Sequence, residues 1–227
     1  MKLGPIYVIT DTSVQSRYSH AELVAAALAG GADVVQLRMK FAATGESGAR
    51  TASAVGPSTR EIVDVARTCA ALCRRVHVPF LVNDRVDVAW TVDADGVHLG
   101  DDDLPLPSAR SLLGPHRILG ASADSIGDVL ARAREGADYC GVGPVFPTST
   151  KSDTGPVLGL DGLAAVVAAS PIPLVAIGGI TLDRIHDVAR TGVAAVAIVS
   201  AICAAESPES ATREAKALWL AARGANR

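Results

Sequence analysis

The sequence of 227 residues has neither an excess of positive charge nor a long apolar run. Its formal net charge of -3 at pH 7 gives no basic field for the phosphate backbone of a nucleic acid. No segment reaches the roughly 20 consecutive apolar residues that a bilayer-spanning helix needs. The chain passes from Met1 into the strand-like run Ile6–Ile9 without a signal-peptide pattern. We therefore expect a cytoplasmic protein that binds neither nucleic acid nor membrane.

Cysteine is also scarce, since the chain has 4 cysteines. Cys69 and Cys73 are spaced to share a helical face, but two thiols on one helix do not by themselves make a zinc site. The others, Cys140 and Cys203, do not extend this pair into the dense framework of a small disulfide-stabilised protein. We expect reduced thiols that are buried in the core.

The chain is rich in a repeated alternation of short apolar, β-rich runs and segments with helical spacing. The runs are near residues 6–10, 33–37, 79–82, 96–99, 117–120, 138–142, 173–177 and 194–199. Most are apolar throughout, which is typical of parallel strands buried on both faces. The alternation favours a single (β/α)8 TIM barrel domain over residues 1–227, with a doubly wound parallel sheet as the alternative.

The segment from Phe41 to Ser58 interrupts this alternation, because it contains mainly small residues and no sustained apolar period. It separates the second predicted strand from a helix predicted over Thr59 to Val76. Loops of this length are uncommon unless they are functional or disordered. We expect a long mobile loop at 41–58 over the mouth of the barrel, and disorder without a function is the alternative.

Polar residues follow the predicted strands, at the ends that share one mouth in a (β/α)8 barrel. After the second strand, alternation places Gln36, Arg38 and Lys40 on one side. Two cations there would be costly unless an anionic ligand, water or barrel carboxylates met them. After the sixth strand, the segment Gly143–Lys151 carries three hydroxyls, a lysine and no carboxylate. Such a loop is suited to binding an anion, and a polar surface turn is the alternative.

Acidic residues follow the third and fourth predicted strands, where Asp84 and the run Asp101–Asp103 are found. Magnesium prefers oxygen ligands and is commonly held by one or two carboxylates together with substrate phosphates. We therefore predict Mg2+ bound by Asp84 and Asp103, beside a pyrophosphate. The alternative for the run is capping of a helix that starts near Pro105. We expect His98 to pack or to orient its neighbours rather than to act as a base.

Small residues follow the last two strands, as Gly178-Gly179 and Val199-Ser200. Backbone N–H groups at such positions can approach a phosphate closely, which is common after the seventh and eighth strands of barrels. The sequence thus predicts two anion sites, one for a metal-bound pyrophosphate and one for a phosphate held by backbone.

The ordered motifs resemble the thiamine-phosphate synthase family. They are QLRMK at 36–40, ND at 83–84, VHLG at 97–100, GAS at 120–122, GPVFPTSTK at 143–151, AIGGI at 176–180 and VS at 199–200. The resemblance covers Ile6 to about Ile202. It implies an enzyme that joins hydroxymethylpyrimidine pyrophosphate to hydroxyethylthiazole phosphate, or to its carboxylated form. The products would be thiamine phosphate and pyrophosphate, formed with Mg2+ through a pyrimidine carbocation and without a protein nucleophile.

The resemblance also implies roles for individual residues. The pyrimidine pyrophosphate would contact Gln36, Leu37, Arg38, Met39, Lys40, Asn83, Ser122 and Lys151. The thiazole phosphate would contact Thr148, Ser149, Thr150, Gly179, Val199 and Ser200. Asp84 and Asp103 would hold the metal. The catalytic residues would be Arg38, Lys40 and Lys151, which would stabilise the departing pyrophosphate.

Three short stretches depart from the family pattern. Asp101 replaces a usual glutamine, Met39 occupies a commonly acidic position, and residues 123–125 read Ala-Asp-Ser where Thr-His-Ser is frequent. Two other functions remain open: a thiazole tautomerase of the same superfamily and a non-catalytic barrel that binds thiamine phosphate. The cations Arg38, Lys40 and Lys151 argue against an isomerase, which releases no pyrophosphate. The expected partners are small phosphorylated substrates, and the sequence predicts no particular oligomeric state.

Overall fold

The computed structural model describes residues 4–39, 56–148 and 155–224. In this part of the chain, eight parallel strands follow one another around a closed barrel, and the last pairs with the first. They are β1 (Ile6–Thr10), β2 (Val34–Leu37), β3 (Phe80–Asn83), β4 (Gly96–Leu99), β5 (Ile118–Ala123), β6 (Tyr139–Val142), β7 (Leu174–Ala176) and β8 (Ala195–Ile198). The (β/α)8 barrel prediction is confirmed. The doubly wound alternative is wrong, because its sheet would have open edges.

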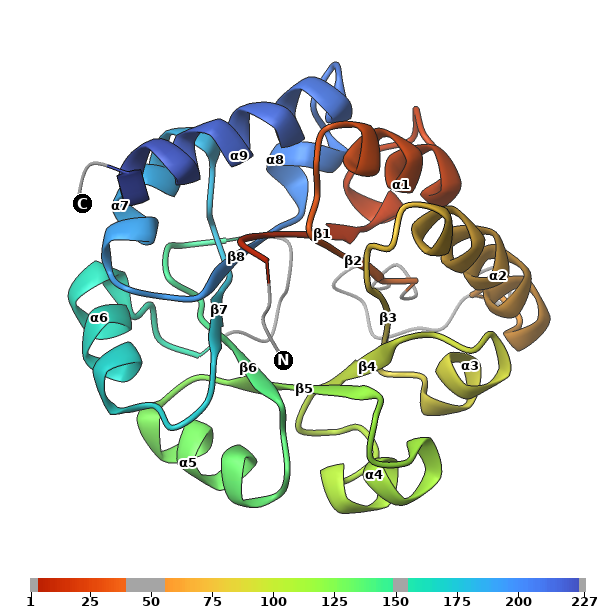
Figure 1. The fold of residues 1–227 in the computed structure, drawn as a ribbon, viewed down its shortest axis with the longest axis horizontal. Coiled ribbons are helices and arrows are strands. Elements are labelled where there is room, and N and C mark those ends of the chain that lie inside the picture. Colours follow the sequence, from red (N-terminus) through yellow and green to blue (C-terminus); the bar gives the residue numbers. More distant parts are fainter. Residues whose placement is uncertain (1–3, 40–55, 149–154, 225–227) are drawn as a thin grey trace, which may run out of the picture.

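Helices surround the strands in a ring, as Figure 1 shows in a view along the barrel. They are α1 (His20–Ala29), α2 (Thr59–Arg75), α3 (Val86–Thr91), α4 (Leu106–Leu113), α5 (Ile126–Arg134), α6 (Gly159–Ala169), α7 (Ile185–Arg190), α8 (Ser200–Cys203) and α9 (Pro208–Gly224), with 3-10 turns η1 (Thr12–Val14) and η2 (Leu182–Arg184). The long α9 packs against both α1 and α7 and closes the ring. Within the described ranges, none of the helices has the length and apolar character needed to cross a bilayer.

Local sequence signals set the start of α2. Ser58 accepts a hydrogen bond from the backbone of Glu61, whose carboxylate accepts one from the backbone of Ser58 in return. This capping box satisfies N–H groups that the first turn of a helix otherwise leaves unpaired. The helix therefore begins at Thr59, as predicted.

The strand β5 continues to Ala123, beyond its predicted end at Gly120. The added residues are small and carry little β propensity, so their pattern does not predict a longer strand. Pairing extends the strand, because Ser122 is in register with Gly141 of β6. As a result, Ser122 belongs to the strand itself and faces the region that the neighbouring strands enclose.

Two apolar layers hold the barrel together. A small inner layer comprises Tyr7, Ile9, Val34, Leu81, Tyr139, Val175, Ala195 and Ala197. A larger layer lies between strands and helices, and it includes Cys69, Cys73 and Cys140. Gly120 makes room inside the barrel, since a Cβ atom there would lie 2.2 Å from Cζ of Tyr139. The inner layer therefore depends on a glycine opposite a large phenol.

Candidate active site

A cavity of about 390 Å³ lies at the carboxyl ends of the strands, and every strand or the loop after it contributes to its lining. Ten of the predicted site residues line it: Gln36, Arg38, Asn83, Asp84, Asp103, Ser122, Thr148, Gly179, Val199 and Ser200. The structure thus brings together residues that are far apart in the sequence. This convergence is the one that barrel closure predicts.

Other predicted residues lie elsewhere. The side chains of Leu37 and Met39 pack in the layer between strands and helices and do not line the cavity. Lys40, Ser149, Thr150 and Lys151 lie outside the described residues, as does most of the loop predicted at 41–58. Their roles therefore stay predictions.

Five side chains form a continuous chain of hydrogen bonds across the barrel interior, which we call the tyrosine–histidine chain. The amide nitrogen of Gln36 donates to the hydroxyl of Tyr7 at 2.8 Å. The hydroxyls of Tyr7 and Tyr139 are 2.8 Å apart. The ring of His98 then connects Tyr139, 2.9 Å from Nδ1, to Ser122, 3.2 Å from Nε2. His98 thus has the contacts expected of a residue that orients its neighbours.

Arg38 forms an ion pair with Asp11, the residue that follows β1. Asp11 is 2% exposed, and its other carboxylate oxygen accepts hydrogen bonds from the backbone and hydroxyl of Ser13, at 2.8 and 2.6 Å. Pairing with a barrel carboxylate was one of the alternatives for this arginine. Asp11 was not among the predicted site residues, although it stands at a strand end as they do.

His20 supports the same strand end from the first turn of α1. Its Nδ1 atom is 3.0 Å from the hydroxyl of Thr10, whose backbone carbonyl accepts a hydrogen bond from the backbone of Arg38. Burial lowers the pKa of His20 to about 4, against an opposing effect of Asp11. The imidazole is therefore neutral at pH 7, and it supports the end of β1 without adding charge.

Two acidic residues at the mouth have defined backbone settings. Asp84 has a φ of 64°, in the left-handed region that aspartate tolerates better than most residues, and its N–H donates to the carbonyl of His98. The carboxylate of Asp103 accepts a hydrogen bond from the backbone of Gly100 at 2.7 Å. Helix α4 starts after Pro105 without a capping side chain, so the capping alternative for the acidic run is wrong.

These carboxylates fit a hard divalent cation in chemical type. No group of three or more His, Cys, Asp or Glu side chains suited to a metal is found in the described ranges. Asp84 and Asp103 nevertheless line one cavity. Two carboxylates are the usual protein share of a magnesium site that substrate phosphates and water complete.

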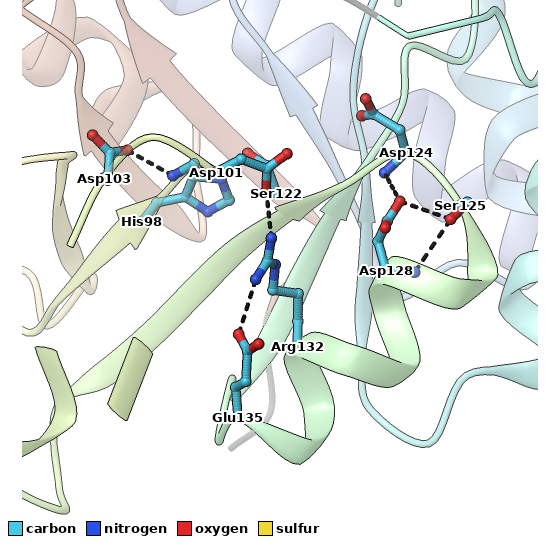
Figure 2. A network of polar contacts seen from close by, with 10 residues as sticks. His98, Asp101, Asp103, Ser122, Asp124, Ser125, Asp128, Arg132 and Glu135 are labelled. Atoms are coloured by element: carbon cyan, nitrogen blue, oxygen red, sulfur yellow. Dashed lines mark hydrogen bonds and ion pairs between the residues drawn. The ribbon is translucent and has the colours of Figure 1, made fainter. Parts of the chain in front are cut away.

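Asp101, the departure from the family pattern, contacts helix α5. Figure 2 shows the guanidinium of Arg132 between the carboxylates of Asp101 and Glu135. The side chain of Asp101 is 73% exposed. Its negative charge is therefore compensated by an arginine from the neighbouring helix and screened by solvent.

The loop after β6 runs beside the loop after β7. Backbone N–H groups of Val145 and Phe146 donate to the carbonyls of Ile177 and Gly178, at 2.9 and 3.0 Å. Gly178 and Gly179 have φ values of 95° and 64°, which favour glycine. The two segments predicted to bind anions are thus one structural unit.

Arg184 of η2 contacts both loops of this unit. Its guanidinium donates to the carbonyl of Gly179 at 2.6 Å and stacks over the ring of Phe146, 4.5 Å from the centroid. No local motif marks this arginine, and it was not among the predicted site residues. The contact fixes the direction of a backbone carbonyl in the glycine loop after β7.

The thiols do not supply a nucleophile. All four are buried and unoxidised, as expected. Burial raises the pKa of Cys203 to about 11 and that of Cys69, Cys73 and Cys140 to about 12. At pH 7 they are protonated, and none of them lines the cavity.

Fold and cavity together define a barrel enzyme for small phosphorylated molecules, with charged side chains on one side of its mouth and glycine-rich backbone on the other. The thiamine monophosphate synthase family model matches residues 6–202, and the chain belongs to this family.

Named relatives agree with this assignment. Thiamine-phosphate synthase of Chloroflexus aurantiacus is 45% identical over 213 residues, which cover 94% of this chain and 91% of the relative. That of Salinibacter ruber is 42% identical over 215 residues, with coverages of 95% and 88%. The solved structure of thiamine phosphate pyrophosphorylase from Pyrococcus furiosus superposes with a TM-score of 0.83 at 39% identity, and 97% of each chain is covered.

Proposed function

We propose that this chain synthesises thiamine phosphate from hydroxymethylpyrimidine pyrophosphate and hydroxyethylthiazole phosphate or its carboxylated form. The observation that carries the proposal is one cavity lined both by Arg38, Asp84 and Asp103 and by the glycine loop after β7. A synthase must bind a pyrophosphate and a second phosphate at once, with the reacting atoms between them. The partners are these two substrates, and the cytoplasmic location stays a prediction.

The pyrophosphate occupies the side of the cavity formed by β2 to β5. Arg38, held by Asp11, presents a planar set of N–H donors that suits phosphate oxygens. Asn83 adds an amide at the same mouth. Lys40 and Lys151 are assigned to the pyrophosphate by family resemblance, and with Arg38 they stabilise the charge of the leaving group.

Asp84 and Asp103 are the residues that would hold Mg2+. When bound, the ion supplies positive charge that neutralises the pyrophosphate and makes it a better leaving group. The hydrogen bond from Gly100 supports this assignment, because it orients the carboxylate of Asp103. Asp101 faces Arg132 in this arrangement and is not a ligand.

The thiazole phosphate occupies the opposite side. Backbone N–H groups at Gly179, Val199 and Ser200 bind its oxygens, as is common at this position in barrels. The hydroxyl of Thr148 lies at the cavity, and resemblance adds Ser149 and Thr150 to the thiazole side.

The reaction then needs positioning more than protein chemistry. The C–O bond of the pyrimidine methylene breaks, the electron pair leaves with pyrophosphate, and the thiazole nitrogen donates its pair to the resulting carbocation. The pocket residues align the two rings and keep water from capturing the cation. The protonated, buried thiols leave no competing cysteine nucleophile.

The test supplies the purified chain with both substrates and Mg2+ and measures thiamine phosphate and pyrophosphate in equal amounts. Removal of the metal with EDTA should abolish product, and Mg2+ should restore it. Tight binding of thiamine phosphate without turnover would instead support the non-catalytic barrel. Isomerisation of a thiazole carboxylate phosphate without condensation would support the tautomerase.

A further inference from the structure

The tyrosine–histidine chain connects two residues assigned to the pyrimidine pyrophosphate, Gln36 and Ser122, through the buried Tyr7 and Tyr139 and the partly buried His98. It uses β1, β2, β4, β5 and β6, so it crosses the barrel interior. The two tyrosines are at most 1% exposed, and Gln36 is 2% exposed. Buried polar groups of this kind are costly unless each donor meets an acceptor. The direction in which the protons point is therefore a physical property of the site.

That direction follows from the amide at one end. The nitrogen of Gln36 can only donate, so the oxygen of Tyr7 accepts. Tyr7 has one proton, and its near neighbour for that proton is the hydroxyl of Tyr139. Tyr139 in turn donates its proton to Nδ1 of the next residue, His98. A neutral imidazole that accepts at Nδ1 carries its proton at Nε2.

The opposite direction is less favourable. If His98 donated from Nδ1 to Tyr139, the latter would donate to Tyr7, which already accepts from Gln36. The hydroxyl proton of Tyr7 would then lack an acceptor, because both Tyr139 and the amide nitrogen of Gln36 would be donating to Tyr7. Burial raises the pKa of both phenols, so each keeps its single proton at pH 7. In the described residues, every buried side-chain nitrogen or oxygen has a hydrogen-bond partner.

We propose that Tyr7 and Tyr139 are positioning residues that hold His98 as the Nε2–H tautomer, so that the hydroxyl of Ser122 donates a hydrogen bond to the pyrimidine substrate. The hydroxyl oxygen of Ser122 receives the N–H of His98 at 3.2 Å, which leaves the hydroxyl proton for an acceptor in the cavity. The ligand atom it meets is a ring nitrogen or a phosphate oxygen. This inference rests on the proposed function for the identity of the ligand.

Two glycines make the geometry possible. Gly120 admits the ring of Tyr139, and a Cβ atom at Gly141 would lie 3.1 Å from Cε1 of His98. A side chain at Gly120 would displace the phenol of Tyr139, and one at Gly141 would crowd the imidazole of His98. The tyrosine–histidine chain thus depends on these glycines as well as on the residues that form its hydrogen bonds.

The first test reads the tautomer directly and needs no activity. Long-range 1H–15N correlation spectra of the 15N-labelled protein near pH 7 distinguish Nδ1–H from Nε2–H rings, and a His98→Gln variant assigns the signals among the 5 histidines. We expect the Nε2–H form for His98. An Nδ1–H ring or an imidazolium would overturn the proposal, even if thiamine phosphate is made.

The second test uses Tyr139→Phe, with Tyr18→Phe as the matched control. Tyr18 donates to the carbonyl of Glu206 and does not line the cavity. Tyr139→Phe should raise the KM for the pyrimidine pyrophosphate about tenfold, which corresponds to one neutral hydrogen bond. The affinity for thiazole phosphate should not change in either variant. Equal kinetics for the two variants would overturn the positioning role, and unchanged thiazole phosphate binding verifies that Tyr139→Phe is folded.

Discussion

The two sides of the barrel mouth differ in how they are equipped to bind anions. On the side of β2 to β5, the cavity is lined by charged and amide side chains, including Arg38, Asp84 and Asp103. On the side of β7 and β8, it is lined by Gly178, Gly179 and the small residues that follow the last strand. One side binds through side chains, and we call it the side-chain half. The other binds through backbone groups, and we call it the backbone half.

In the side-chain half, three of the charged residues are held by a second residue. Asp11 pairs with Arg38, Gly100 donates to Asp103, and Arg132 pairs with Asp101. Such partners hold a charged group in place and offset the cost of removing it from water. Each contact is separate, so a substitution here should change one ligand interaction at a time.

The backbone half depends instead on the path of the chain. Its glycines adopt positive φ values, and its loop is fixed to the loop after β6 by backbone hydrogen bonds. Backbone dipoles bind an anion without a charged group that must be desolvated. A change of path moves all donors together, so this half should respond to substitution as a unit.

The largest expected effect is that of Gly179→Ala. A Cβ atom there would lie 2.5 Å from the carbonyl oxygen of Pro147, at a φ of +64°. Strain of this kind costs about 1–3 kcal/mol, so the affinity for thiazole phosphate should fall up to roughly 100-fold. Calorimetric titration measures it, while the affinity for pyrimidine pyrophosphate should change much less.

The matched control for this prediction is Gly136→Ala. Gly136 has a φ of +93°, and a Cβ atom there would meet nothing within 4 Å. It therefore carries the strain of a positive φ without the clash, and it does not line the cavity. Retained thiazole phosphate binding in Gly179→Ala, or an equal loss in the control, would contradict the role given to the backbone half.

An intermediate effect is expected for Asp11→Asn. Asparagine keeps an oxygen that can accept from Ser13 but loses the charge that holds Arg38. The affinity for pyrimidine pyrophosphate should fall roughly tenfold, with thiazole phosphate binding unchanged, because one charge-assisted hydrogen bond is lost. Steady-state kinetics with each substrate varied in turn measure the difference.

Asp93→Asn is the matched control. Asp93 precedes β4 and pairs with Arg117, which precedes β5, so the pair lies at the other end of the barrel. It removes the same charge from an aspartate–arginine pair that is remote from the cavity. If Asp11→Asn lowers the affinity for both substrates to the same extent, the separation of the two halves is wrong.

The fold was predictable because parallel strands that are buried on both faces leave continuous apolar runs in the sequence. The ends of the strands were less predictable. Strand β5 extends through small residues because it pairs with β6 there. At the candidate site, strand-end chemistry predicted that residues such as Arg38 and Asp103 lie at one mouth, and both line the cavity there, since barrel closure brings all strand ends together.

The contacts behind those residues were not predictable in the same way. Tyr7 and Tyr139 lie inside apolar strands and resemble ordinary core residues, and 132 positions separate them. Their hydrogen bond exists only because the barrel closes and because Gly120 leaves space. Arg184 is five residues from Gly179, but the turn between them decides that they meet. Asp11 stood at a strand end and could have been found.

The smallest expected effect, that of Asp101→Asn, tests which carboxylates belong to the metal within the side-chain half. Asp101 is exposed and pairs with Arg132, and exposed ion pairs contribute about 0–1 kcal/mol. The Mg2+ concentration for half-maximal activity should therefore stay within about fivefold of the parent value, by the same estimate. Asp103→Asn should raise it at least about tenfold, because a carboxylate ligand is lost. A shift in Asp101→Asn as large as that in Asp103→Asn would make Asp101 a ligand, and the pairing with Arg132 would then have to break when the metal binds.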